Sequence, residues 1–157
     1  MTPELFFQRA LPAAIAGGHI WPEYACCEAA EESAWGESEL ARQANNLFGL
    51  KASRYGNAYP IIAMPTHEWE NGHLVPAVAD WPKYPDWKTS FAERMATLRR
   101  LAPEFPHYAA ALAAASGDEF VRQVSLTWST DPRRADNVLA IYGDHASLLA
   151  QLRTASA

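Results

Sequence analysis

One stretch of the sequence decides the fold and most of the chemistry, namely Ala29-Ala30-Glu31-Glu32-Ser33-Ala34-Trp35-Gly36. It ends a segment that Pro22 opens, and the residues between are small and apolar almost all round, which predicts a buried central helix through about Ala34. Glu31 and Glu32 then lie near the C-terminal end of that helix. Carboxylates there oppose the helix dipole, so we infer that they serve a purpose other than local stability.

Proline, glycine and capping residues predict shorter helices around the central one. Thr2 followed by Pro3 starts a first helix that runs to Gly17, with Pro12 bending or dividing it. Ser38 caps a short helix over residues 39–44, and a loop follows.

Helical periodicity returns in the C-terminal half of the chain. Phe91, Met95 and Leu98 recur at helical spacing and predict a core-facing stripe. The further helices that we expect are Tyr108–Ala115, one from Asp118 through Trp128, one from Asp131-Pro132 through Tyr142, and a last one over Asp144–Arg153.

Residues from about 50 to 81 are rich in proline, glycine and β-formers and predict a small β-lobe inserted between helices. The tetrad Glu70-Asn71-Gly72-His73 is the strongest hairpin signal in the chain. A two-residue turn there pairs Glu70 with His73 and Glu68 with Val75, and each face then carries alternate residues. One face carries Thr66, Glu68 and Glu70, and the other carries His67, Trp69 and Leu74. Glu68 is therefore expected to face a cleft while Trp69 packs.

Length and composition limit the chain to one domain, and its charge and hydropathy argue against several classes of partner. A chain of 157 residues, 49% of them apolar, buries a sizeable core as one domain over residues 1–157. We expect an α+β fold, predominantly helical. The net charge of −5 and the lack of a long Lys/Arg run argue against nucleic acid as a partner. No apolar stretch reaches the roughly 20 residues that a bilayer requires, so we expect no membrane insertion.

Neither a cofactor nor a metal is expected. Cys26 and Cys27 are adjacent, a spacing that suits neither a disulfide nor a metal site, so we interpret them as small buried residues. His67 and His73 lie on opposite faces of the predicted hairpin, which makes a shared metal improbable.

Two carboxylates fit the cleavage of a glycosidic bond. That reaction needs an acid to protonate the leaving oxygen and a second group to stabilise or attack the cationic sugar. Glu32 ends an apolar helix beside Trp35, in surroundings that favour a protonated acid, and Glu68 on its exposed strand is the second candidate. Glu70 shares the face of Glu68 and could replace it in a shifted register. Glu31 points about 100° away from Glu32 on the helix and takes a supporting role.

The ordered motifs of the chain resemble one family over nearly its whole length. They are Ala29–Gly36, Ser38-Glu39-Leu40-Ala41, Asn45-Asn46-Leu47-Phe48-Gly49-Leu50-Lys51, Thr66-His67-Glu68-Trp69-Glu70-Asn71-Gly72, Tyr84-Pro85-Asp86-Trp87 with Ser90-Phe91, and Trp128-Ser129-Thr130-Asp131-Pro132 followed by Ala135-Asp136 and Val138-Leu139. In this order they are similar to the signature of the bacterial endo-β-N-acetylglucosaminidases, glycoside hydrolase family seventy-three. That family includes the hydrolase domain of the flagellar rod-associated protein, many autolysins and phage lysins.

The resemblance implies a lysozyme-like fold and hydrolysis of the N-acetylglucosaminyl-β-1,4-N-acetylmuramic acid bond, with Glu32 as general acid and Glu68 as second carboxylate. The sequence departs from the family in one segment. Trp128 stands where the family usually has tyrosine before the Thr-Asp-Pro run, and Arg134 replaces the next tyrosine. A phenol hydroxyl is then missing unless another residue, such as Tyr142, supplies it, because an indole nitrogen donates but does not accept.

Five residues are candidates for binding the sugar chain: Trp128, Trp69, Asn46, Phe48 and Tyr142. Trp128 and Trp69 suit stacking on a sugar face, although most tryptophans in a small domain are core residues. Asn46 and its neighbour Asn45 either close a loop turn, which is the commoner role, or bind the acetamido group of the sugar.

We expect a peptidoglycan hydrolase that acts as a monomer on glycan strands, in the periplasm or at the cell wall. The first residues have neither the basic nor the apolar region of a signal peptide, so we expect export by phage lysis or a secretion system, with an export or immunity partner. One alternative is a non-catalytic peptidoglycan-binding or assembly module of the same fold, which the missing tyrosine favours. Another is a lytic transglycosylase or muramidase. A transglycosylase needs only one acid, and the match at Glu68 argues against it.

Overall fold

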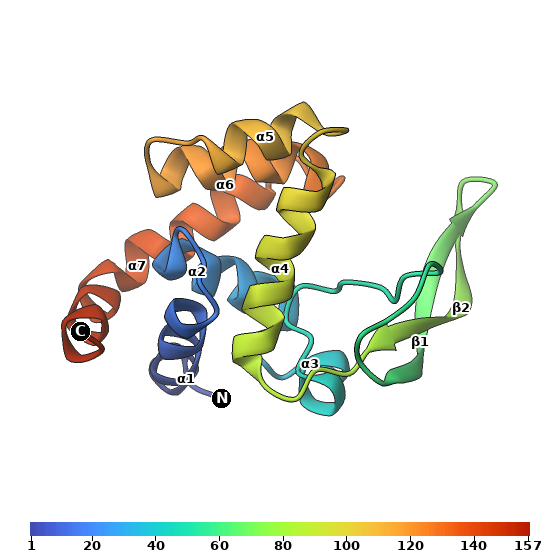
Figure 1. The fold of residues 1–157 in the computed structure, drawn as a ribbon, viewed down its shortest axis with the longest axis horizontal. Coiled ribbons are helices and arrows are strands. Elements are labelled where there is room, and N and C mark those ends of the chain that lie inside the picture. The colour runs from blue at the N-terminus through green and yellow to red at the C-terminus, as the bar shows by residue number, and fades with distance from the viewer.

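The computed structural model describes all 157 residues as a body of helices from which a two-stranded hairpin projects (Figure 1). In chain order the elements are α1 (Pro3–Ala16), α2 (Pro22–Ser33), α3 (Glu39–Ala44), β1 (Ile61–Glu70), β2 (His73–Pro82), α4 (Trp87–Leu101), α5 (Pro106–Leu112), α6 (Gly117–Trp128) and α7 (Arg134–Ala155). The hairpin lies between α3 and α4 in the chain, which confirms the predicted insertion of strands between helices.

Helix α2 lies at the centre of the body and packs against α1, α6 and α7. Its Ala25, Cys26, Cys27, Ala29 and Ala30 are all buried, and their small side chains let the neighbouring helices approach closely. The prediction of a buried central helix is confirmed, and both cysteines are free and buried within it. The last turn of α2 is therefore held from several sides.

A sharp turn ends α2. Ser33 Oγ donates to a main-chain carbonyl one turn earlier at 2.5 Å and accepts from the N–H of Gly36 at 2.9 Å. Ala34 and Trp35 both adopt positive φ, 50° and 58°, so the chain turns back at once. Gly36 also has positive φ, and a Cβ there would lie 3.0 Å from the ring of Trp87. Glycine is therefore the residue that this close approach allows.

Side-chain caps start α1 and α3 where the sequence predicts them. Thr2 Oγ1 accepts from the N–H of Leu5 at 3.3 Å, and Ser38 Oγ accepts from the N–H of Ala41 at 3.2 Å. Pro12 does not divide α1, which is one helix over its whole length. A proline removes one intrahelical hydrogen bond, and the packing of the buried face of α1 on the core outweighs that loss.

Strands β1 and β2 pair antiparallel in the register that the sequence predicts. Glu70 pairs with His73, and Glu68 pairs with Val75. Asn71 and Gly72 both have positive φ, 51° and 81°, as a type I′ hairpin turn requires. The structure therefore does not adopt the shifted register, in which Glu70 would replace Glu68.

The two faces of the hairpin differ in their burial. Met64 and Trp81 are buried on the face that also carries Glu68. Trp69 lies on the opposite face and is 70% exposed. The expectation that Trp69 packs is therefore wrong, because the hairpin projects away from the helical body and its outer face meets solvent (Figure 1).

Helix α4 carries the predicted apolar stripe. Phe91, Met95 and Leu98 are buried, and the helix packs against α1 and α5. Arg94 is fully buried with them, since it lies three residues after Phe91 and therefore on the same face. A guanidinium thus stands inside the core, next to the end of α2.

The C-terminal helices differ from the prediction at their boundaries. A single helix α7 runs where two are predicted, and it passes through Gly143. Glycine costs only about 1 kcal/mol relative to alanine in a helix, which the burial of Val138 and Leu149 outweighs. Helix α5 begins at Pro106, and Ser116 caps α6 just before its predicted start. None of the helices is long and apolar enough to cross a membrane.

Candidate active site

Glu32 opens onto a hollow between the helical body and the loop that precedes the hairpin. Its lining residues come from α2, α4, α5, α6 and this loop: Glu32, Phe48, Gly49, Leu50, Lys51, Thr97, Leu101, Tyr108 and Trp128. We call it the Glu32 hollow. Glu32 is the only carboxylate that lines it, while Phe48, Tyr108 and Trp128 give it aromatic walls. A single acid beside aromatic surfaces is an arrangement that suits a sugar ligand.

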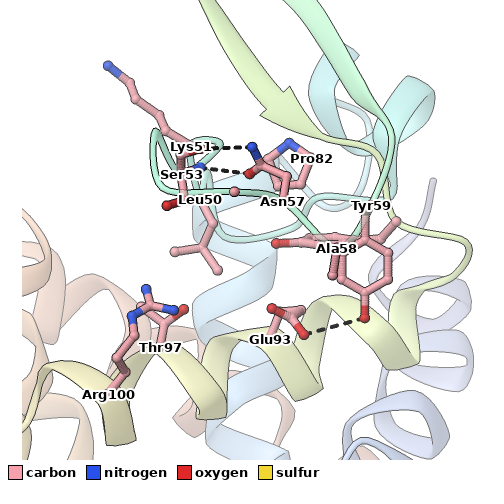
Figure 2. A pocket seen from close by; sticks show the side chains of 12 residues that line it. Leu50, Lys51, Ser53, Asn57, Ala58, Tyr59, Pro82, Glu93, Thr97 and Arg100 are labelled. Carbon is pink, nitrogen blue, oxygen red and sulfur yellow. Dashed lines mark hydrogen bonds between the residues drawn. The ribbon is translucent and has the colours of Figure 1, made fainter.

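A second hollow lies between α4 and residues 50–60 (Figure 2). Leu50 and Lys51 are among the residues that line both. Tyr59 Oη donates to Glu93 Oε1 at 3.4 Å at the far end (Figure 2). Because the two hollows share lining residues, they adjoin each other along α4, and we call the pair the groove along α4. A groove of this kind suits an extended ligand better than a compact one.

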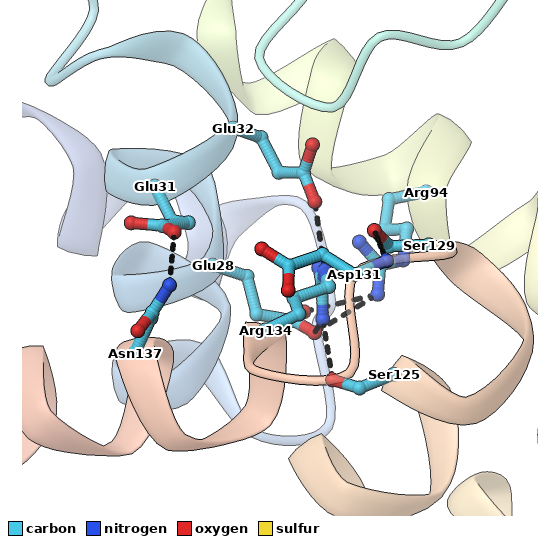
Figure 3. Close-up of polar contacts among 9 residues, drawn as sticks. All are labelled: Glu28, Glu31, Glu32, Arg94, Ser125, Ser129, Asp131, Arg134 and Asn137. Carbon is cyan, nitrogen blue, oxygen red and sulfur yellow. Dashed lines mark hydrogen bonds and ion pairs between the residues drawn. The ribbon is translucent and has the colours of Figure 1, made fainter.

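The carboxylate of Glu32 is held by an arginine from α7 (Figure 3). Oε1 of Glu32 accepts from Nε of Arg134 at 2.8 Å. The Glu32 side chain is 25% exposed, whereas that of Arg134 is 3% exposed. The apolar surroundings predicted for Glu32 are therefore wrong on this side, and Trp35 packs instead against Phe6 and Phe7. The other carboxylate oxygen, Oε2, makes no hydrogen bond within the chain.

Arg134 links Glu32 to two further buried charges. Its Nη1 donates to Glu28 Oε1 at 3.0 Å and to Ser125 Oγ at 2.8 Å. Glu28 in turn accepts from Nη2 of Arg94 at 3.0 and 3.2 Å. The four groups therefore form a line of alternating charge, with two positive and two negative members. Glu28 and Arg94 are fully buried within it.

The pKa shifts in this cluster follow from its charges. Burial alone would raise the pKa of Glu28, but Arg94 and Arg134 outweigh it and hold that pKa below the usual value. Burial alone would lower the pKa of Arg134, but Glu28 and Glu32 outweigh it and raise that pKa. Both groups are therefore charged at neutral pH, as buried ion pairs require.

The buried guanidinium of Arg94 lies against two walls of the Glu32 hollow. Its Cζ is 3.8 Å from the ring centroid of Trp128 and 4.8 Å from that of Phe48. Phe48 also meets Phe91 edge to face at 5.4 Å, which fixes the ring from the core side. One side of Trp128 is therefore taken by Arg94, and only its remaining surface is open to a ligand.

Asparagines and a serine fix the loop that carries Phe48. Asn46 is 1% exposed, and its side chain both donates to the carbonyl of Leu50 at 2.8 Å and accepts from its N–H at 3.2 Å. Asn45 donates to the carbonyl of Tyr84 at 3.0 Å, and Ser90 Oγ accepts from a loop N–H at 3.0 Å. Asn46 thus closes the loop turn and does not line the Glu32 hollow.

Glu68 lies outside the Glu32 hollow but next to its rim. Its Oε1 is 2.9 Å from Nζ of Lys51, which lines the hollow. Glu68 is about half exposed, as expected for a strand that projects into solvent. Glu70 is exposed and makes no ion pair or hydrogen bond with a residue of the hollow. Of the two hairpin glutamates, only Glu68 is connected to the Glu32 hollow.

Comparison with known proteins identifies the family. Residues 10–147 match the family model described as mannosyl-glycoprotein endo-beta-N-acetylglucosaminidase. The chain belongs to this glucosaminidase family. Among curated relatives, exo-glucosaminidase LytG of Bacillus subtilis is 32% identical over 125 residues, which cover 78% of this chain and 43% of LytG. A probable N-acetylmuramidase of Lactococcus lactis subsp. cremoris is 31% identical over 127 residues, covering 78% of this chain and 28% of the relative. This member of the family therefore spans less than half the length of either relative.

Solved structures confirm the predicted fold of this glucosaminidase-family chain. A truncated glycoside hydrolase domain of Salmonella typhimurium FlgJ aligns with a TM-score of 0.70 and 26% identity, covering 92% of this chain and 97% of that one. The catalytic domain of the autolysin Auto from Listeria monocytogenes aligns with a TM-score of 0.78 and 24% identity, covering 97% and 89%. The mainly helical, lysozyme-like architecture with an inserted hairpin is thus shared.

Other candidates from the sequence lie away from the Glu32 hollow of this glucosaminidase-family chain. Tyr142 stacks on Tyr24 with ring centroids 4.0 Å apart and does not line the hollow. Trp69 is on the outer face of the hairpin. Glu31 accepts from Asn137 Nδ2 at 3.0 Å on the surface between α2 and α7 (Figure 3). Tyr142 and Glu31 therefore make local contacts that do not involve Glu32, and Trp69 is exposed.

Sequence reasoning missed the charges beneath Glu32 and most of the residues that line the hollow, Lys51 and Tyr108 among them. A signal for the charges was present. Glu28 lies within the run of small, apolar residues and four residues before Glu32, so both carboxylates share one face. Arg94 falls within the apolar stripe of its helix, and a cation there predicts a buried anionic partner.

Proposed function

We propose that this chain is a peptidoglycan hydrolase that cleaves the β-1,4 bond between N-acetylglucosamine and N-acetylmuramic acid, with Glu32 as the acid. One observation carries the proposal: Glu32 is the only carboxylate that lines an aromatic-walled hollow, in a chain of the glucosaminidase family. The groove along α4 extends from Glu32 towards residues 50–60 and gives room for a glycan strand beyond the bond that is cut. The proposed site of action is the cell wall or periplasm, where the chain acts as a monomer after export with a partner.

Glu32 has one carboxylate oxygen bound and one free. Oε1 is held by Arg134, so Oε2 is the atom that carries the proton to the glycosidic oxygen. Phe48, Tyr108 and Trp128 line the same hollow. Phe48 and Tyr108 are buried, whereas Trp128 is partly exposed and offers its open surface to the apolar face of a sugar ring. These side chains exclude water around the bond and orient it towards Glu32.

Glu68 is the proposed second carboxylate, on the opposite side of the groove from the helical body. Two mechanisms use it differently. As a base it activates a water that attacks the sugar from the far side and inverts its configuration. Alternatively the acetamido group of the substrate attacks, and Glu68 orients that group. The ion pair with Lys51 supports both, because it ties Glu68 to the rim of the Glu32 hollow.

Digestion of purified peptidoglycan with wild type, Glu32→Gln, Glu68→Gln and Glu31→Gln tests the proposal. Glu31→Gln is the matched control, since Glu31 is the neighbouring residue of α2 and bonds to Asn137 outside the hollow. Mass spectrometry of the new ends should show reducing N-acetylglucosamine in wild type and in the control only. Full activity of Glu32→Gln would refute the assignment of the acid.

A second bond remains a candidate because one relative is a probable N-acetylmuramidase. Reducing N-acetylmuramic acid ends in the same digestion would identify that activity, and anhydro-muramic ends would identify a lytic transglycosylase. Binding of glycan strands with no new ends would favour the non-catalytic module. The four outcomes are distinguished by one set of mass spectra.

A further inference from the structure

Figure 3 shows the line of ion pairs beneath Glu32, which ends at Arg94. Its members are Glu32, Arg134, Glu28 and Arg94, and successive N–O distances are 2.8, 3.0 and 3.0 Å. Glu28 and Arg94 are completely buried and Arg134 is 3% exposed. Arg94 then packs on Trp128 at the far end. One buried cluster thus contacts both the acid and an aromatic wall.

Stability alone does not account for this burial. A buried ion pair gains little over well-packed apolar side chains, because the loss of hydration offsets the attraction between the charges. The cluster nevertheless spans α2, α4 and α7 and reaches the surface only at Glu32. Its placement therefore indicates a role at Glu32.

Buried partners set the orientation of the Arg134 guanidinium. Nη1 is bonded to Glu28 and Ser125, and Nε is bonded to Glu32. A planar group held on two sides cannot rotate, so its buried partners fix the direction of the Nε–H that binds Glu32. Glu32 must align Oε1 with that direction, and its other oxygen then points away from Arg134 (Figure 3).

We propose, on the basis of the hydrolase function above, that Arg134 is a positioning residue for Glu32. By binding Oε1 it presents Oε2 to the leaving oxygen of the glycosidic bond. As the proton moves from Oε2 to that oxygen, the bond from the sugar carbon to it breaks. The bonding electron pair stays on the leaving oxygen, which departs as an alcohol, and the sugar carbon becomes cationic. Glu32 is left as a carboxylate beside a guanidinium that is already oriented to stabilise it.

Kinetics of Arg134→Met and Arg134→Lys test this role, with Arg153→Met as the matched control. Arg153 also lies on α7 and pairs with a glutamate of α2, Glu23 at 3.6 Å, but on the surface. Loss of Arg134 leaves Glu28 and Arg94 as a neutral pair, so we expect Arg134→Met to fold, as thermal unfolding can verify. On solubilised peptidoglycan, kcat should fall about tenfold to hundredfold with KM within about twofold. Lysine should restore part of kcat, and Arg153→Met should match wild type.

A double-mutant cycle separates positioning from a general loss of structure. If Arg134 acts through Glu32, Arg134→Met adds nothing to Glu32→Gln, and the double variant keeps the residual rate of Glu32→Gln. Additive losses would overturn the proposal. An unchanged kcat per folded molecule in Arg134→Met would overturn it as well.

Crystal structures of the same variants give a readout that does not depend on turnover. Glu32 should take one conformer in wild type and in Arg153→Met, and a shifted or multiple conformation in Arg134→Met. A single unchanged conformer in Arg134→Met refutes the positioning role. Another outcome is that wild type fails to cleave peptidoglycan while Glu32 still becomes disordered in the Arg134→Met crystal structure. That pair of results would refute the hydrolase function but would still show that Arg134 orders Glu32.

Discussion

Nζ of Lys51 lies 2.9 Å from Oε1 of Glu68, so an ion pair joins the projecting hairpin to the rim of the Glu32 hollow. Both side chains are about half exposed, and such a pair contributes only about 0 to 1 kcal/mol to stability. Its importance is positional. Lys51 lines the hollow, and its ion pair holds Glu68 beside the rim. The contact distinguishes Glu68 from Glu70, the other glutamate of the hairpin.

Replacement of Glu68 by glutamine should lower the release of reducing sugar ends by at least about tenfold, because the developing sugar cation loses its second carboxylate. Glu70→Gln is the control, since Glu70 shares the face of Glu68 but pairs with His73 at the hairpin tip. Its activity should stay within about twofold of wild type. Equal losses in the two variants would contradict the specific role of Glu68. Thermal unfolding should be unchanged in both, as both side chains are exposed or half exposed.

Replacement of Glu32 by glutamine should lower kcat by about 10² to 10⁴, the range that general acid catalysis supplies. Glutamine keeps the size of the side chain and an oxygen that can accept from Arg134, so the fold is retained. Glu31→Gln changes the same charge one residue earlier, where it meets Asn137 and not the hollow. Activity that persists in Glu32→Gln at the level of Glu31→Gln would show that another group is the acid.

Replacement of Glu28 by glutamine should cost about 3 to 5 kcal/mol of unfolding free energy, because the buried Arg94 then lacks its counter-charge and the buried Arg134 keeps only Glu32. Urea denaturation measures this loss. Glu23→Gln is the matched variant on the same helix, and its surface pair with Arg153 should be worth less than about 1 kcal/mol. A cost at Glu28 as small as that at Glu23 would mean that the cluster is more hydrated than the structure shows.

Much of the fold is predictable because local interactions decide it. The cap of Ser38 acts three residues along the chain, and the turn at Asn71-Gly72 follows from backbone preferences alone. The buried character of α2 is visible in its composition. Features that depend on distant neighbours are less visible. Helix α7 continues through Gly143 because of packing, and Trp69 is exposed because no element covers the outer face of the hairpin.

The candidate site divides in the same way. Glu32 is identifiable from its motif, and Glu68 from the register of its hairpin. The contact between Glu32 and Arg134 joins residues 102 positions apart, and no local pattern reports it. The resemblance to the family indicates only that Arg134 stands where the family usually has a tyrosine. Arg134 reaches Glu32 because α7 packs against α2, and this packing is a tertiary contact that the sequence does not show.

The last prediction concerns His19, a buried histidine next to the ion-pair cluster. Its Nδ1 accepts from the N–H of Trp21 at 3.1 Å, its ring meets Phe120 at 5.4 Å, and its Nε2 is buried with no partner. Burial lowers the pKa of His19 to about 3, and the positive charge of Arg94 adds to the effect while Glu28 opposes it. The folded chain therefore keeps this histidine neutral well below pH 6.

Because the unfolded chain protonates His19 near its ordinary pKa of 6.5, it binds more protons than the folded chain between about pH 6.5 and 3. Stability should therefore fall as the pH is lowered through this window, by about 2 kcal/mol from this group between pH 7 and pH 5. Urea denaturation of wild type and His19→Asn at both pH values isolates the effect, since the carboxylates contribute equally to both proteins. Asparagine keeps an acceptor for the N–H of Trp21 but does not titrate. Between pH 7 and pH 5 the His19→Asn variant should therefore lose about 2 kcal/mol less stability than wild type. Equal pH dependence in the two proteins would show that His19 gains a proton in the folded state without cost, and hence that its burial is not maintained in solution.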